Sequence, residues 1–141
     1  MLAEPVEVGD RCLAWVMRAG LDVEGVEFAT PGHAPLQVGF MGHKAGHKIT
    51  PHEHLPVERR VQGTAEVLLI RRGLLKVNFF APGERISNES RILGAGDVIL
   101  LVDGGHSFEV LEDLEMVEVK QGPYAGEQDK QRFEASVNVG A

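Results

Sequence analysis

The chain has 141 residues, of which 43% are hydrophobic and 25% are charged, as is ordinary for a single soluble domain. Its net charge of −7 argues against nucleic acid or an anionic membrane as a partner. Cys12 is the only cysteine, which excludes an internal disulfide and a thiolate metal cluster. Composition and charge together favour a soluble domain with a small-molecule ligand. Because there is no apolar run of ~20 residues and no signal-peptide pattern, we expect the protein in the cytoplasm.

Seventeen glycines and seven prolines favour short strands separated by turns. In chain order, the expected strands cover residues 12–17, 25–29, 36–41, 65–70, 74–80, 85–93, 98–102, 106–110 and 114–120. Gly73 is expected to form the turn of a hairpin between the fourth and the fifth of these strands. Residues 125–134 are expected to form at most a helical turn, and residues 136–141 a loose tail.

This succession of short strands predicts an all-β sandwich or barrel. We expect one domain over residues 1–141, with N-terminal strands at 11–30, a barrel core at about 36–120 and a C-terminal tail at 121–141. The sequence shows no linker, low-complexity segment or internal repeat that would divide the chain further.

Two histidines that are two residues apart, His52 and His54, are the most informative feature of the sequence. On an extended strand such residues point to the same face, and imidazole is a common ligand of transition metals. Glu66 opens an apolar strand, where an unpaired carboxylate is costly unless it has a cation. His106 begins another strand and shares a face with Phe108. Together, the three histidines and the glutamate predict a mononuclear metal site.

The same residues resemble the first motif of the cupin superfamily, which is glycine, five residues, His-x-His, a short spacer, glutamate, six residues and glycine. Every interval fits except the spacer, which has eleven residues; the matching positions are Gly46, His52, His54, Glu66 and Gly73. Residues 96–106 resemble the second motif, with valine at the usual proline and one residue fewer before the histidine. The resemblance implies a double-stranded β-helix, a jelly-roll barrel that holds one divalent metal on His52, His54, Glu66 and His106.

The identity of the carboxylate ligand has an alternative. Glu58 lies four residues after His54, which is the usual distance in the family. We prefer Glu66 because an apolar strand and a glycine turn follow it, whereas Glu58 sits in a charged loop. Three imidazoles and one carboxylate suit Fe, Mn, Ni, Co, Cu or Zn. The other three histidines are expected on the surface: His33, His43 and His47.

The ligand set favours an enzyme, a metal-dependent isomerase, lyase or dioxygenase, in which Glu66 and His106 are the catalytic residues. Its substrate is expected to be a small polar or anionic metabolite, such as a sugar, a sugar phosphate or a carboxylate. Four residues are candidates for binding it, in the long spacer and after the last strand: Arg59, Arg60, Lys120 and Tyr124.

Two other functional readings stay open. The first is a non-catalytic module that binds or senses a small molecule such as a carbohydrate. The second is a metal-free epimerase-like protein with histidine and tyrosine as acid and base, which leaves the pair of His52 and His54 without a role. The apolar residues Val67 and Leu69 also predict a homodimer, because a small barrel cannot easily cover them.

Overall fold

The structure, a computed structural model, describes residues 2–137 and is built almost entirely from strands, which confirms the all-β prediction. In chain order the elements are β1 (Glu4–Val8), β2 (Arg11–Met17), β3 (Gly25–Phe28), β4 (Gly39–Gly42), β5 (Glu66–Phe80), β6 (Ile86–Ser87), β7 (Glu89–Gly94), β8 (Val98–Leu101), β9 (Gly105–Lys120), the 3₁₀ helix η1 (Gly126–Asp129) and β10 (Ser136–Val137). The expected helical turn is therefore confirmed. Within residues 2–137, no helix is long and apolar enough to cross a membrane.

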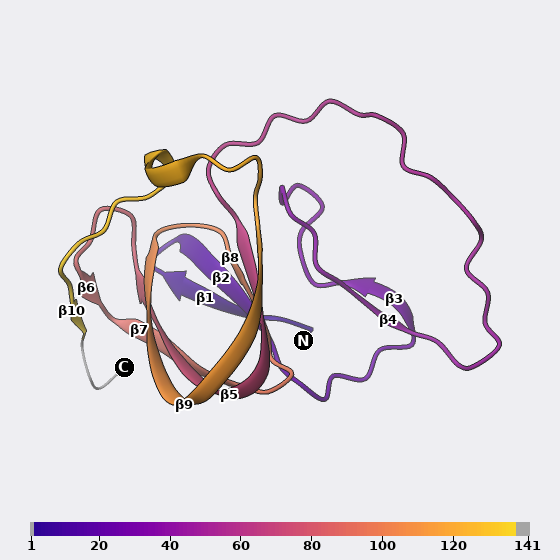
Figure 1. The fold of residues 1–141 in the computed structure, drawn as a ribbon, viewed down its shortest axis with the longest axis horizontal. Coiled ribbons are helices and arrows are strands. Elements are labelled where there is room, and N and C mark those ends of the chain that lie inside the picture. Colours follow the sequence, from indigo (N-terminus) through magenta and orange to yellow (C-terminus); the bar gives the residue numbers. More distant parts are fainter. Residues whose placement is uncertain (1, 138–141) are drawn as a thin grey trace.

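The main sheet has six strands, and most of them pair in the order β1-β2-β8-β5-β7. The sixth, β9, pairs with β5 along its whole length, so β8 and β7 must share the other edge of β5. Figure 1 shows that the long β5–β9 ribbon curls strongly, with its two ends lying near each other. These pairings do not close into a barrel among the described residues, and the double-stranded β-helix stays a prediction.

The hairpin turn expected at Gly73 is wrong, because β5 runs through this position as one strand of 15 residues. The register against β9 shifts between Ile70 and Leu75, so a bulge replaces the turn. Gly73 has a φ of 95°, and a Cβ built on it would lie 2.1 Å from the carbonyl oxygen of Asp113. Bulges bend and twist a strand, which explains how the ribbon curls here.

Three other expected boundaries also need correction. The strands expected at 106–110 and 114–120 are joined in β9, which has 16 residues. The strand expected at 85–93 is divided into β6 and β7. Part of the expected loose tail forms β10, which pairs in parallel with β6, while residues 138–141 lie outside the described part. In each case a partner strand decides where the strand begins and ends.

The core lies on the inner face of the curled ribbon. It contains apolar side chains from β1, β2, β5, β7 and β8 that are at most 1% exposed, among them Leu13, Leu68, Ile70, Val77 and Ile99. Burial of such a side chain contributes about 1.5–3 kcal/mol. The packing therefore holds the ends of β5 and β9 in a fixed relation to each other.

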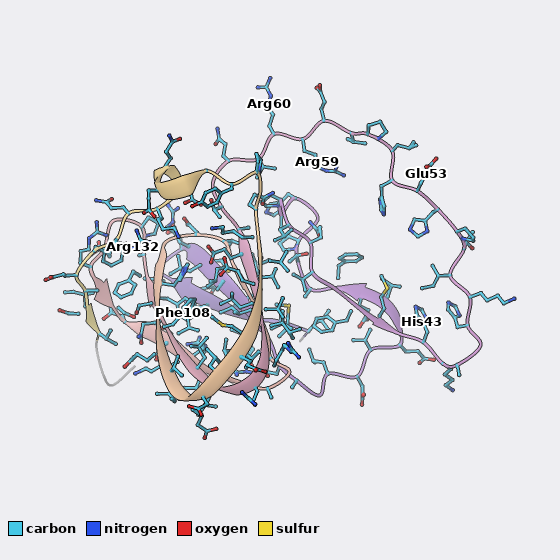
Figure 2. The ribbon with its side chains drawn as sticks, viewed as in Figure 1. His43, Glu53, Arg59, Arg60, Phe108 and Arg132 are labelled. Carbon is cyan, nitrogen blue, oxygen red and sulfur yellow. The ribbon has the colours of Figure 1, made fainter. Side chains whose placement is uncertain are left out.

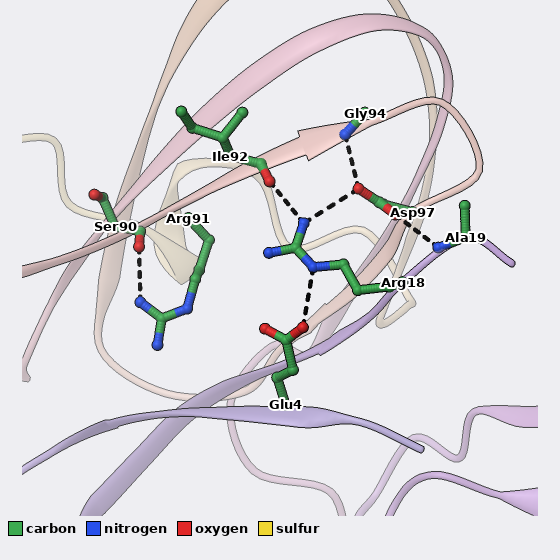
Figure 3. A network of polar contacts seen from close by, with 8 residues as sticks. All are labelled: Glu4, Arg18, Ala19, Ser90, Arg91, Ile92, Gly94 and Asp97. Carbon is green, nitrogen blue, oxygen red and sulfur yellow. Dashed lines mark hydrogen bonds and ion pairs between the residues drawn. The ribbon is translucent and has the colours of Figure 1, made fainter. Parts of the chain in front are cut away.

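A polar network ties the N-terminal strands to the rest of the sheet (Figure 3). The carboxylate of Asp97 accepts hydrogen bonds from the backbone amides of Ala19 (2.7 Å) and Gly94 (2.8 Å). Arg18 bridges the same carboxylate (3.2 Å) and Glu4 (3.1 Å). Since Asp97 is only 8% exposed, its hydrogen bonds to the two backbone amides are shielded from water and anchor the turn before β8.

Residues 43–65 form neither helix nor strand, so His52 and His54 do not lie on an extended strand that would point both rings to one face. In Figure 1 this segment, the linking segment, swings out in a wide arc between β4 and β5. Its large apolar side chains remain exposed, for example at 58% for Ile49 and 72% for Leu55. The physical reason is the lack of a hydrogen-bonded partner strand, since no pairing within residues 2–137 includes this segment.

Candidate functional site around Glu66 and His106

Glu66 and His106 meet at the ends of the curled ribbon. Glu66 is the first residue of β5, and His106 is the second residue of β9, where it pairs with Phe79. Directly opposed residues in antiparallel strands lie on the same face, so His106 shares the face of the buried Phe79. The distance from His106 Nε2 to Glu66 Oε2 is 3.6 Å. The structure therefore brings together two of the four predicted metal ligands.

Burial shifts both groups toward their neutral forms. It raises the pKa of Glu66, and the negative charge of Glu118 adds to this, while Lys120 and Lys130 oppose it. Burial also lowers the pKa of His106, against the opposing effect of Glu118. His106 is therefore a neutral imidazole at neutral pH, with one ring nitrogen free to accept a proton or bind a metal. The separation of 3.6 Å is longer than a hydrogen bond, and the two groups form an ion pair only when His106 is protonated.

A cavity of about 760 Å³ opens beside the pair. Its walls come from the ends of β5, β8 and β9, from residues 81–85 and from residues 129–135 of the C-terminal segment. This volume falls within the range of roughly 300–1,000 Å³ that is typical of small-molecule sites. The cavity thus places a carboxyl group and a neutral imidazole next to a space that suits a small metabolite.

The predicted ligands His52 and His54 are not brought to this cavity. Both are exposed in the linking segment, where their rings lie edge-on to each other with a centroid distance of 5.4 Å. The Nδ1 atom of His52 lies 2.9 Å from the backbone carbonyl of Thr50. Among residues 2–137, no three histidine, cysteine, aspartate or glutamate side chains gather closely enough to hold a metal ion. The alternative carboxylate Glu58 is exposed in the same segment and does not line the cavity.

The predicted substrate-binding residues also lie outside the cavity wall. Arg59 and Arg60 project from the linking segment into solvent (Figure 2). Lys120 lies opposite Glu66 in the backbone register of β5 and β9. Its ammonium lies 6.0 Å from the ring centroid of Tyr124, a residue that is 85% exposed. Lys120 is therefore near the pair in the sheet, and its charge reaches Glu66.

The three histidines expected on the surface are exposed, as predicted: His33, His43 and His47. Sequence reasoning missed Arg85, Lys130 and Phe133, which do line the cavity. The available signal was the charged run of residues 129–132, which follows the last long strand and ends in an aromatic residue.

The arrangement can bind a small polar molecule and move a proton between it and Glu66 or His106. One carboxylate oxygen and one imidazole nitrogen also match the ligand chemistry of a divalent transition metal. They supply two ligands, whereas a mononuclear catalytic site takes about three from the protein. No protein-family model, curated protein or solved structure matches this chain.

Proposed function

We propose that the chain is a metal-binding cupin enzyme that acts on a small polar or anionic metabolite in the cavity beside Glu66 and His106. The observation that supports it most is the 3.6 Å approach of these two side chains at the wall of a cavity of about 760 Å³. A partly buried carboxyl group with a raised pKa and a neutral imidazole in one pocket are typical of a functional site.

In this proposal His52 and His54 complete the metal site when the linking segment folds against β9. The edge of β9 that faces away from β5 has no partner among the described strands. On the face that carries His106, Phe108 is 37% exposed and Val110 is 59% exposed. A strand added to this edge would cover these apolar side chains and those of the linking segment. It would also extend the sheet toward a double-stranded β-helix.

A bound divalent metal would supply Lewis acidity to a substrate oxygen. The protein side chains do the rest: His106, kept neutral by burial, can accept a proton at Nε2, and Glu66 can take up a proton more readily than an exposed carboxylate. Isomerisation, elimination and dioxygenation are all compatible with such a pair.

Metal content tests the proposal directly. Protein purified without a histidine tag, and then reloaded with Mn²⁺, Fe²⁺ or Zn²⁺, should retain about one equivalent by elemental analysis. The double variant His52→Ala/His54→Ala and the single variant His106→Ala should each weaken metal binding by about 100-fold, because each removes side chains that coordinate the metal directly. The double variant His43→Ala/His47→Ala removes the same number of exposed imidazoles and should bind as the wild type does.

Less than about a tenth of an equivalent in the reloaded wild type would overturn the metal proposal. Equal binding by the His52→Ala/His54→Ala variant would overturn the four-ligand site. Circular dichroism of each variant checks that the sheet is intact.

Association into a homodimer is a separate proposal. On the outer face of the sheet, Leu69 pairs with Val117, and the two are 38% and 42% exposed; the adjacent Val119 is 52% exposed. A second copy of the chain could cover this patch. Light scattering after size-exclusion chromatography should give twice the monomer mass, and Val117→Glu should return it to one. A wild type that remains monomeric would refute the proposal.

A further inference from the structure

The C-terminal segment of residues 129–135 forms a wall of the cavity that is fixed at both ends. At one end, the hydroxyl of Thr64 donates a hydrogen bond to the carboxylate of Asp129 (3.2 Å). At the other end, the ring of Phe133 packs edge-on against Phe80, with a centroid distance of 5.2 Å. The backbone amide of Ser136 then bonds the carbonyl of Arg85 (2.9 Å). The residues between these anchors are therefore held beside the cavity.

Phe133 is the stronger anchor because two more groups enclose it. The guanidinium carbon of Arg85 lies 4.0 Å from its ring centroid, a cation–π contact. A Cβ at Gly105 would lie 3.1 Å from the ring, so the aromatic side chain occupies the space that glycine leaves open. The guanidinium of Arg85 therefore already has a partner within the cavity wall, the ring of Phe133.

Most charged groups of the cavity wall already have a partner. Asp103 is paired with Arg11, and Arg132 is paired with Glu127, each at 2.5 Å. Lys130 has neither an ion pair nor a side-chain hydrogen bond within the described residues 2–137. Its positive charge contributes to lowering the pKa of both Glu66 and His106. Lys130 thus places an ammonium without an ion-pair partner among the described residues in the wall of the cavity that Glu66 and His106 also line.

We infer that Lys130 binds the anionic group of the ligand in this cavity. The ligand carries a carboxylate or phosphate oxygen at the end that Lys130 contacts. It presents uncharged hydroxyl or carbonyl groups to Glu66 and His106, because the carboxylate of Glu66 and the nearby Glu118 repel a second anion. The inference deepens the proposed function, on which it rests for the use of this cavity, and assigns recognition to the C-terminal wall.

Titrations followed by amide chemical shifts in ¹H–¹⁵N spectra of ¹⁵N-labelled protein test the inference. The probes are two matched pairs: glycerol 3-phosphate with glycerol, and succinate with succinamide. In the wild type, the anion of at least one pair should shift amides of the cavity wall, such as those of Gly105 and Phe133, and bind about tenfold more tightly than its neutral partner. The pair with the larger preference identifies phosphate or carboxylate as the source.

Three variants locate the cation. Lys130→Gln should weaken binding of the preferred anion about tenfold, whereas Lys130→Arg keeps the charge and should stay within about threefold of the wild type. Lys44→Gln, in the exposed linking segment, should bind as the wild type does. The same spectra show whether each variant is folded.

Two results would overturn the inference: a wild type that binds the anions no better than the neutral partners, and a Lys130→Gln variant that binds them as tightly as the wild type. Metal content measured on the same samples separates this from the proposed function. Lys130→Gln should keep the metal content of the wild type. Lys130-dependent anion binding in a wild type that loads no metal would leave the inference standing and refute the metal proposal.

Discussion

The β5–β9 ribbon and the linking segment each carry two of the four predicted metal ligands, but only the two in the ribbon lie at the cavity. In the ribbon, backbone pairing and the core behind it bring Glu66 and His106 to 3.6 Å from each other. In the linking segment, residues 43–65 have no partner strand, and His52 and His54 remain exposed. Ligand spacing in the sequence therefore places side chains together only where a neighbouring strand fixes the backbone.

The largest expected contrast between the two regions is in core packing. Ile99→Ala removes a side chain that is 0% exposed, and should lower the free energy of unfolding by about 2–5 kcal/mol. Ile49→Ala makes the same change at a side chain of the linking segment that is 58% exposed, and should change it by less than about 0.5 kcal/mol. Urea unfolding measures both. A large loss for Ile49→Ala would show that the linking segment packs against the sheet in solution.

The bulge at Gly73 gives the next effect. Gly73→Ala combines a φ of 95° with an overlap against the carbonyl of Asp113, and should cost about 3 kcal/mol. Gly83→Ala is the matched control, because Gly83 has a similar φ of 79° with nothing within 4 Å of the added Cβ, and should cost about 1 kcal/mol. Thermal or urea unfolding compares the two. Equal losses of stability in the two variants would mean that the close approach of Gly73 to the carbonyl of Asp113 does not contribute to the stability of the ribbon.

Asp97 tests the polar anchor of the sheet. Asp97→Ala leaves the backbone amides of Ala19 and Gly94 without their acceptor, and should lower the free energy of unfolding by about 2 kcal/mol. Asp97→Asn retains one oxygen acceptor and should lose less. The exposed Asp22 provides the control, since Asp22→Ala should have little effect. If Asp97→Ala and Asp22→Ala were equal in urea unfolding, the network in Figure 3 would not stabilise the fold.

The smallest effect is the pH dependence of the metal-free protein. Burial holds the pKa of His106 below the ordinary value of about 6.5. The unfolded chain therefore binds this proton at a higher pH than the folded chain does, so stability falls as the pH drops below about 6.5 toward the folded pKa. Glu66, with its raised pKa, acts in the opposite sense, because the folded chain takes up that proton first.

Urea midpoints at about pH 7.5 and pH 5.5, with a chelator present, measure this dependence. His106→Gln should reduce the loss of stability between the two values, whereas His33→Gln, at an exposed position, should not. An unchanged loss in His106→Gln would show that burial of this imidazole does not contribute.

Much of the fold could be predicted because most of its strands are indicated by local patterns of apolar residues. The apolar runs of β2, β5, β8 and β9 were found, and so was the helical turn η1. The merging of two expected strands in β5 could not be predicted. Gly73 is typical of a turn in sequence, and only its packing against Asp113 in β9 makes it a bulge. The C-terminal wall was missed for a similar reason. Phe133 becomes part of the cavity wall only by packing against Phe80 and Gly105, which lie far from it in the sequence.

The amino-acid sequence alone was enough to predict the all-β class and the approximate strands, and to select Glu66 and His106 as candidate site residues. Alternating and continuous apolar runs carry this information, since side-chain periodicity is a local property of the chain. The three-dimensional structure was needed to show that Glu66 and His106 meet and that Arg85 and Lys130 line the cavity. Those distances depend on strand pairing, on the bulge at Gly73 and on the return of residues 129–135 across the end of the sheet, and no local pattern encodes them.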